Sequence, residues 1–289
     1  MFNFKKKKPS PNARIEYRTR ILGPNSSFAT SEAYNKLRTN LLYTLADKQC
    51  PVVGVTSAFK GGGKSLTLAN LAIALGQLGK KVLVIDCDLR SPVQHRVFNM
   101  KNVSGVSEIL GGFQQGGISV CKTKDHPNVS LLTAGRTPPN PSELLASTRM
   151  EKLIAILKEK FDMIIIDLPP INVVTDAGVI SSLVDGYMFV VRAGNDDNRT
   201  VPSALENLKQ MNGNILGVVL NDVDLSQDRY GRYGRYGRYG RYGKYGYGYG
   251  NTSNFQVAPV ATEEEAATDD IAFTGIQNEQ IEQKNADKN

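Results

Sequence analysis

A loop rich in glycine and lysine has the composition of a phosphate-binding site. The segment Ser57-Ala-Phe-Lys-Gly-Gly-Gly-Lys-Ser65 approximates the pattern G-x-x-x-x-G-K-[ST], with Ala58 in the place of the first glycine. Glycines let consecutive backbone N–H groups turn toward phosphates, and the start of a following helix adds the positive end of its dipole. Lys64 would then reach the β and γ phosphates of ATP, and the Ser65 hydroxyl would bind Mg²⁺. The residues expected to contact nucleotide in this loop are Phe59, Lys60, Gly61, Gly62, Gly63, Lys64, Ser65 and Leu66.

Three aspartates follow apolar runs that are typical of buried strands. Asp86 and Asp88 follow the run that ends at Ile85, and Asp167 follows the run Met163 to Ile166. Because the carboxyl ends of parallel strands meet at one edge of a sheet, these carboxylates are expected beside the phosphate loop. Cys87, between the first two aspartates, is expected to point to the opposite face and into the core. The residues expected to hold Mg²⁺, directly or through water, are Ser65, Asp86, Asp88 and Asp167.

Three other positions are candidates for the same site, each with an ordinary structural alternative. Asn221 ends an apolar run and is a candidate for nucleotide binding, although a strand-end asparagine can also cap its own turn. The segment Thr175-Asp176-Ala177 follows Asp167 and would also suit a helix N-cap. Arg192 either lines the nucleotide pocket or forms a surface ion pair.

The apolar periodicity predicts alternating strands and helices between residues 30 and 225. A first helix is expected from a cap at Thr30 or Ser31 to about Asp47. Strands are expected at Val52 to Thr56, Lys81 to Ile85, Val129 to Leu132, Met163 to Ile166, Tyr187 to Val191 and Ile215 to Leu220, and helices at Ser65 to Leu78, Pro141 to Glu159 and Thr200 to Met211. Short buried strands interleaved with helices predict an α/β fold with a doubly wound, mostly parallel sheet. The doubled Asp-x-Asp after the second strand places this P-loop NTPase fold in the deviant-Walker branch.

The two ends of the chain differ in composition from the P-loop domain, which is expected to span residues 29–228. Residues 1–28 are expected to form a basic, flexible arm, and residues 251–289 an acidic, disordered tail. Between them, residues 229–250 repeat Arg-Tyr-Gly, a three-residue period that fits neither a helix nor a strand and predicts disorder. This array holds eight of the twelve tyrosines: Tyr230, Tyr233, Tyr236, Tyr239, Tyr242, Tyr245, Tyr247 and Tyr249.

Composition excludes several classes of protein. Residues 21–228 carry twenty basic and nineteen acidic groups, so the net charge of +7 does not indicate a nucleic-acid-binding domain. Three cysteines and two histidines cannot build a disulfide framework or a zinc cluster, which favours a reducing cytosol. No run approaches eighteen apolar residues, so neither a membrane span nor a secretory signal is expected.

Together these motifs resemble the catalytic domain of the bacterial tyrosine kinases (BY-kinases) that control capsule and exopolysaccharide synthesis, over residues 30–250. Ala58 to Ser65 matches the Walker A motif of that family, Val84 to Arg90 matches Walker A′, and Ile164 to Asp167 matches Walker B. Residues 132–147 resemble a family signature that MinD/ParA-type partition ATPases lack, and a tyrosine-rich C-terminus is a family hallmark. Asn221 stands where related ATPases contact the adenine base, and Thr175-Asp176-Ala177 resembles their switch segment. Because no membrane span precedes the domain, the chain is expected to be the split, Gram-positive form, whose activator is a separate membrane protein.

Two features depart from the family pattern. Lys60 matches the signature lysine of MinD/ParA ATPases, which reaches a neighbour's phosphates across a dimer; a local phosphate contact and a solvated loop residue are the alternatives. The family's oligomerisation motif Glu-x-x-Arg-x-x-Arg is represented here by Glu32, Asn35 and Arg38, without the middle arginine. Three-residue spacing still places these side chains on one side of a helix, but a ring held by them is expected to be weaker.

The resemblance implies an ATP- and Mg²⁺-dependent protein-tyrosine kinase that phosphorylates its own C-terminal tyrosines, mainly in a neighbouring subunit. Its catalytic candidates are Lys64, Asp86 and Asp88, and Asp86 is expected to accept or orient the tyrosine proton. The implied partners are a membrane activator with a cytoplasmic segment and a phosphotyrosine phosphatase, and the implied location is the cytoplasmic face of the cell membrane. The alternatives are a MinD/ParA-like ATPase switch, supported by Lys60, and a polyanion-binding Arg-Tyr-Gly tail; nucleic acid is not the expected partner.

Overall fold

The structure, a computed structural model, describes residues 20–113, 117–194, 199–223 and 268–271. All of these except Asp222 and Val223 belong to one compact unit. The eight tyrosines of the Arg-Tyr-Gly array lie outside the described residues. Within the described part of the chain, no helix is both long enough and apolar enough to cross a membrane.

The described residues form one sheet in the order β7-β6-β1-β5-β2-β4-β3-β8. The strands are β1 (Val52–Ser57), β2 (Val82–Asp86), β3 (Ile118–Lys122), β4 (Val129–Leu132), β5 (Met163–Asp167), β6 (Gly186–Arg192), β7 (Ile215–Asn221) and β8 (Thr268–Ile271). Neighbouring strands from β7 to β4 are parallel, whereas β3 is antiparallel to both β4 and β8. The prediction of a mostly parallel, doubly wound α/β fold is therefore confirmed.

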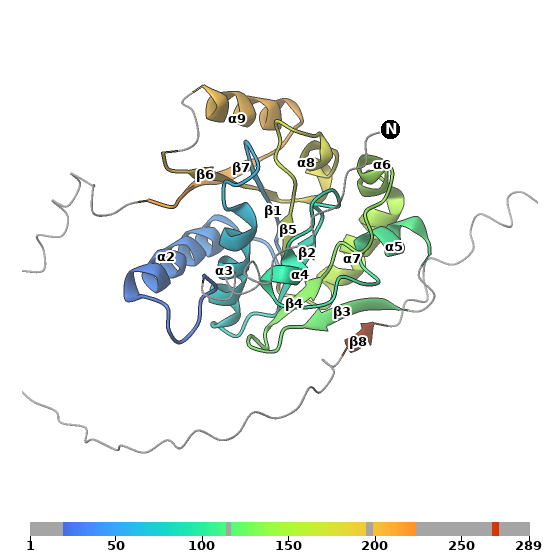
Figure 1. Cartoon of the computed structure of the whole chain (residues 1–289), viewed down its shortest axis with the longest axis horizontal. Coiled ribbons are helices and arrows are strands. Elements are labelled where there is room, and N and C mark those ends of the chain that lie inside the picture. Colours follow the sequence, from blue (N-terminus) through green and yellow to red (C-terminus); the bar gives the residue numbers. More distant parts are fainter. Residues whose placement is uncertain (1–19, 114–116, 195–198, 224–267, 272–289) are drawn as a thin grey trace, which may run out of the picture. The chain divides into compact units, whose positions relative to one another are not determined.

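Helices cover the sheet on both faces. They are α2 (Phe28–Thr44), α3 (Lys64–Gly76), α4 (Gln94–Val97), α5 (Val106–Gly111), α6 (Pro141–Leu145), α7 (Thr148–Lys158), α8 (Asp176–Val179), the 3-10 helix η1 (Ser181–Leu183) and α9 (Thr200–Gln210). Helices α2 and α3 lie side by side (Figure 1) and share one core with one face of the strands, while the second core contains buried residues of α5 to α9.

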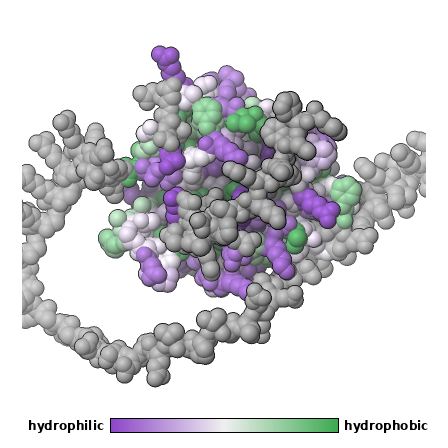
Figure 2. Space-filling view, viewed as in Figure 1, coloured by the Kyte–Doolittle hydropathy of each residue, from purple (hydrophilic) through white to green (hydrophobic). Residues whose placement is uncertain are grey.

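The division into two cores follows from the alternation of side chains along each strand. In β5, Met163 and Ile165 belong to the core under α2 and α3, whereas Ile164 and Ile166 belong to the core under the other helices. Both sets are buried, which explains why the strand sequence is an unbroken apolar run. On the face drawn in Figure 2, hydrophobic residues are scattered among hydrophilic ones, as expected when the large apolar side chains fill the two cores.

The structure differs from the sequence-based expectations in four places. Helix α2 begins after Ser27, three residues before Thr30 and four before Ser31, because the Ser27 hydroxyl accepts from the Thr30 N–H and caps the helix there. The single helix expected from Pro141 to Glu159 is two helices, α6 and α7, which Ser147 separates. Strand β3 was not predicted, and Thr268–Ile271 forms β8 in a segment that was expected to lack regular structure.

The end of the predicted N-terminal arm packs on the domain. Leu22 is buried in the core under α2 and α3, and its N–H donates to Asn70 Oδ1 at 2.8 Å. Asn70 Nδ2 in turn donates to the Arg20 carbonyl oxygen at 3.1 Å. Since Asn70 is itself buried in α3, residues 20–22 are anchored by satisfied polar groups, and the boundary of the domain lies before residue 28.

The centre of β1 admits no side chain larger than that of glycine. A Cβ atom at Gly54 would lie 2.7 Å from two ring carbons of Tyr187 and 3.1 Å from a methyl carbon of Leu168. Tyr187 is fully buried in β6, and its hydroxyl donates to the carbonyl oxygen of Ala177. The ring cannot withdraw from Gly54 without disturbing that hydrogen bond.

We expect Gly54→Ala to lower the free energy of unfolding by about 1–3 kcal/mol, because the added methyl group overpacks the core. Urea denaturation measures this change. Gly217→Ala in β7 is the matched control, since a Cβ at Gly217 meets nothing within 4 Å, and its effect should stay within about 0.5 kcal/mol. Equal effects of the two substitutions would show that Tyr187 does not constrain β1.

Candidate active site

The phosphate loop and the three aspartates meet at the carboxyl ends of β1, β2 and β5. Strand register sets this arrangement, because Asp167 of β5 is paired with Val55 of β1 on one side and with Asp86 of β2 on the other. The loop after β1 leads directly into α3, whose first residue is Lys64. Gly61 and Gly63 adopt φ values of +93° and +86°, a region in which residues with a Cβ are strained, so the loop conformation requires glycine at these positions.

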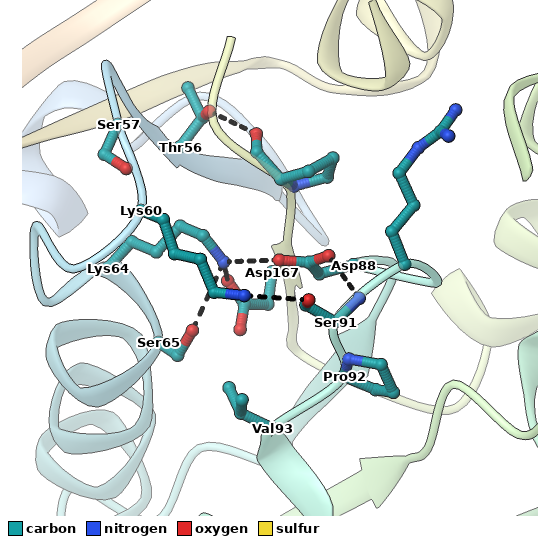
Figure 3. Close-up of polar contacts among 12 residues, drawn as sticks. Thr56, Ser57, Lys60, Lys64, Ser65, Asp88, Ser91, Pro92, Val93 and Asp167 are labelled. Carbon is teal, nitrogen blue, oxygen red and sulfur yellow. Dashed lines mark hydrogen bonds and ion pairs between the residues drawn. The ribbon is translucent and has the colours of Figure 1, made fainter. Parts of the chain in front are cut away.

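Lys64 occupies the centre of the site. Its Nζ lies 3.1 Å from Asp88 Oδ2, 3.0 Å from Asp167 Oδ1 and 3.3 Å from Ser65 Oγ (Figure 3). Burial alone would lower the pKa of Lys64, but the charges of Asp167 and Asp88 and its hydrogen bonds to them raise it above the ordinary value. Lys64 is therefore a fixed positive charge beneath the phosphate loop.

Asp86 lies below this cluster and has no exposed surface. Its Oδ2 accepts from the backbone N–H groups of Val93 and Gln94, both at 3.0 Å, and its Oδ1 accepts from the Asp88 N–H at 3.3 Å. Burial, and after it the neighbouring charge of Asp167, raises the pKa of Asp86 to about 8. In this state Asp86 holds the loop between β2 and α4, and a substrate hydroxyl could reach it only if that loop moved.

Gln94, which the sequence analysis did not single out, contacts residues of all three motifs. Its backbone N–H donates to Asp86, and its side-chain Nε2 donates to the Ser65 carbonyl oxygen at 3.1 Å and to Asp167 Oδ2 at 2.7 Å. No sequence pattern marks this glutamine, because its partners lie 29 and 73 residues away.

The upper part of the site is formed by loop contacts. Lys60 extends across the site in Figure 3, and its Nζ donates to Ser91 Oγ at 3.0 Å, so in one chain this lysine joins the phosphate loop to the loop after β2. Asn221 Nδ2 donates to the Gly62 carbonyl oxygen at 3.2 Å rather than capping its own turn. A Cβ at Gly63 would lie 2.0 Å from the same Nδ2 atom, which is a second reason for glycine there.

A second polar cluster joins three segments beside the site. Asp176, with no exposed surface, accepts from Arg90 Nε at 3.0 Å and Nη2 at 3.2 Å, and from the Ser142 hydroxyl at 2.5 Å. Arg90 follows Asp88 by two residues, and Ser142 lies in the segment that carries the family signature. The candidate switch residue Asp176 therefore connects the loop after β2 to α6 and α8.

Several predicted residues lie apart from this cluster. Arg192, at the end of β6, is paired in register with Asn221 of β7. Cys87 is buried, and its pKa is raised mainly by burial and to a smaller extent by the charge of Asp86. On α2, Asn35 Nδ2 donates to Glu32 Oε1 at 2.9 Å, whereas Arg38 Nη1 donates to the Ala74 carbonyl oxygen of α3 at 2.8 Å. Arg38 thus has a partner within its own chain.

The donors present suit Mg²⁺ bound together with a nucleotide. Ser65 Oγ, Asp88 and Asp167 offer hard oxygen atoms close to one another, around the Lys64 ammonium. Among the residues that the structure describes, no group of three or more His, Cys, Asp or Glu side chains could hold a metal ion by itself. An incomplete set of protein ligands agrees with the usual coordination of Mg²⁺, which keeps several waters and uses one or two protein oxygens plus substrate phosphates.

A glycine-rich loop before α3, an Asp-x-Asp after β2 and an aspartate at the end of β5 define a P-loop protein with deviant Walker motifs. A family model described as an AAA domain matches residues 52–214. The putative tyrosine-protein kinase CapB of Staphylococcus aureus is 37% identical over 198 residues, which are 68% of this chain and 86% of CapB. Tyrosine-protein kinase YwqD of Bacillus subtilis is 37% identical over 200 residues, 68% of this chain and 83% of YwqD.

The solved kinase domain of the Escherichia coli tyrosine kinase ETK has the same fold. It aligns with a TM-score of 0.66 and 31% identity, over 76% of this chain and 80% of that domain. The chain belongs to the family of bacterial tyrosine-protein kinases, as its motifs predicted.

We expect Arg90→Met to lower the free energy of unfolding by about 2–3 kcal/mol, because it leaves the buried Asp176 carboxylate without its cation. The double variant Arg90→Met/Asp176→Asn should be more stable than Arg90→Met alone, since the uncompensated charge is gone. Denaturation of both variants and of Arg136→Met, a substitution at an exposed arginine, measures these effects. A double variant less stable than the single one would contradict the pairing.

Proposed function

We propose that this chain is an ATP-dependent protein-tyrosine autokinase that phosphorylates its own C-terminal tyrosine array, mainly in a neighbouring copy. The observation that carries the proposal is the position of Lys64, held at the start of α3 between Asp88 and Asp167. The family of the chain supports the same activity, because its relatives CapB and YwqD are named tyrosine-protein kinases. The array itself supplies eight acceptor hydroxyls.

The transfer itself forms one bond and breaks one. A tyrosine oxygen attacks the γ-phosphorus of ATP, the bond from that phosphorus to the β–γ bridging oxygen breaks, and ADP leaves with the bond's electron pair. Lys64 and the loop N–H groups stabilise the negative charge on the phosphoryl group in transit. Mg²⁺, held through Ser65, Asp88 and Asp167, neutralises phosphate charge when it is bound.

The phenolic proton must pass to a base, and we assign this role to Asp86. Its carboxylate belongs to the same strand end as Asp88, close to the Lys64 ammonium. The oxygens of Asp86 are occupied by the N–H groups of Asp88, Val93 and Gln94, and its pKa is raised to about 8. The assignment therefore requires the loop after β2 to open when the acceptor tyrosine arrives, and Asp86 to be ionised when it accepts the proton. Asp86→Asn should therefore retain nucleotide binding and lose the transfer step.

The acceptor array follows β7 after a short length of chain. Asn221 contacts Gly62 of the phosphate loop, and Tyr230 follows nine residues later, a length of chain that spans at most about 32 Å. The first tyrosines can therefore reach a nearby active site, and the later ones reach further. Transfer between copies is the part of the proposal that needs its own test.

The wider role that we propose is regulation of capsular or exopolysaccharide synthesis and export, at the cytoplasmic face of the membrane. The proposed partners are a membrane activator with a cytoplasmic segment, an opposing phosphotyrosine phosphatase and further copies of this chain in a ring. Glu32, Asn35 and Arg38 are the proposed ring contacts. Since Arg38 already donates to Ala74, the ring should be weaker than one held by a complete motif.

One observation favours a second function, that of a MinD/ParA-like ATPase switch. Lys60 stands at the position of the signature lysine of those ATPases, directly before three glycines. Within a single chain, however, the Lys60 ammonium lies over the site (Figure 3) and contacts Ser91. Lys60 could therefore also contact nucleotide phosphates in its own chain. A switch of this kind would hydrolyse ATP on dimerisation and leave the tyrosines unmodified.

We expect incubation with Mg-ATP and the cytoplasmic segment of the activator to produce a phosphotyrosine signal that Lys64→Met abolishes. The reason is that this lysine is the cation expected to contact the transferring phosphoryl group. Immunoblotting with an anti-phosphotyrosine antibody measures the signal, and Lys209→Met in α9 is the matched control. ATP hydrolysis without any phosphotyrosine would favour the switch instead.

We expect transfer between copies to label a catalytically inactive chain. A Lys64→Met protein with an intact tail is mixed with an active protein that ends at residue 228, so that only the inactive chain carries the array. Radiolabel from ATP should appear on the inactive chain and increase with the concentration of the active one. Labelling of full-length wild type without any labelling in this mixture would show that transfer stays within one chain.

A further inference from the structure

The Gln94 side chain joins the Walker A serine to the Walker B aspartate from α4, in addition to the contacts that Lys64 makes with the same two residues. It is fully buried at the first position of α4. Its Nε2 lies 3.1 Å from the Ser65 carbonyl oxygen and 2.7 Å from Asp167 Oδ2. Its backbone N–H is held by Asp86, so three motifs fix its position.

The chemistry of these partners determines which way the amide faces. A carbonyl oxygen and a carboxylate oxygen can only accept hydrogen bonds, so the NH₂ group of Gln94 must face Ser65 and Asp167. The other end of the same amide, Oε1, is then directed away from both. It is buried and has no hydrogen-bond partner in the structure. A buried acceptor without a donor costs free energy, so a donor that arrives with a ligand would relieve this cost.

We propose that Gln94 is a positioning residue of the magnesium–nucleotide site. This rests on the ATP and Mg²⁺ binding of the proposed function. The Nε2 group fixes Asp167 through Oδ2 and leaves Oδ1, the atom now paired with Lys64, to face the ion. The Oε1 atom accepts a hydrogen bond from a water that enters with Mg²⁺, since this ion keeps several waters when it binds to proteins.

The role is distinct from that of a purely structural residue. A side chain that only supports the fold would affect nucleotide binding equally with and without Mg²⁺. A side chain that orients a magnesium-facing carboxylate should matter only when the ion is present. Partners of metal-binding groups typically change metal affinity by about 10- to 100-fold when they are substituted.

The test measures ADP binding to the full chain by isothermal titration calorimetry, in MgCl₂ and in EDTA. Gln94→Met keeps the length of the side chain but removes both polar ends. For this variant, the dissociation constant in EDTA divided by that in MgCl₂ should fall at least about tenfold, while the constant in EDTA changes less than about twofold. Gln94→Asn withdraws the amide by one methylene and should act in the same direction. Gln210→Met, at an exposed position of α9, should leave both values unchanged.

An unchanged magnesium ratio in a folded Gln94 variant would overturn the proposal, whether the affinity is retained in both buffers or lost equally in both. Thermal melting without nucleotide establishes that each variant is folded. The binding measurement does not depend on phosphoryl transfer. Wild-type protein that binds Mg-ADP and yet never forms phosphotyrosine would therefore refute the kinase proposal and leave the assignment of Gln94 standing.

Discussion

The site depends on one buried cation that two carboxylates share. Lys64 cannot be buried at the start of α3 without compensation, and Asp88 and Asp167 supply it at 3.1 and 3.0 Å. Burial, and after it the charge of Asp167, raises the pKa of the neighbouring Asp86 to about 8. Even without a charge on Asp86, the two carboxylates that share Lys64 outnumber its ammonium. A site with excess negative charge repels free phosphates and accepts them together with a divalent cation. This balance supports the proposed binding of nucleotide together with Mg²⁺ in preference to nucleotide alone.

The fold makes this charge arrangement possible by bringing distant segments to one edge of the sheet. Strands β1, β5 and β2 are adjacent and parallel, so their carboxyl ends deliver the phosphate loop, Asp167 and Asp86 to the same place. The two apolar cores fix the strands from both faces. The loops above them are joined by polar contacts between segments, Lys60 to Ser91 and Arg90 to Asp176.

The sequence was sufficient to predict the fold class, the phosphate loop and the edge at which the aspartates meet. These features depend on local patterns, namely glycine content and apolar runs that end in aspartate. It did not predict the roles of Gln94 and Arg90, because each depends on partners far along the chain whose approach is set by strand order. Strand β3 was missed as well, since its burial alternates only weakly and Lys122 at its end is exposed. The buried position of Asp86 could not be foreseen either, because a strand end can face the solvent or the loop that follows it.

The most direct test of this account is a crystal structure of the protein with Mg²⁺ and a non-hydrolysable ATP analogue. The account predicts that the Lys64 ammonium leaves Asp88 and Asp167 and lies within hydrogen-bond distance of the β and γ phosphate oxygens. The two carboxylates should then face the ion, with Gln94 still bound to Asp167. A structure in which nucleotide is bound while Lys64 remains paired with both aspartates would contradict the account.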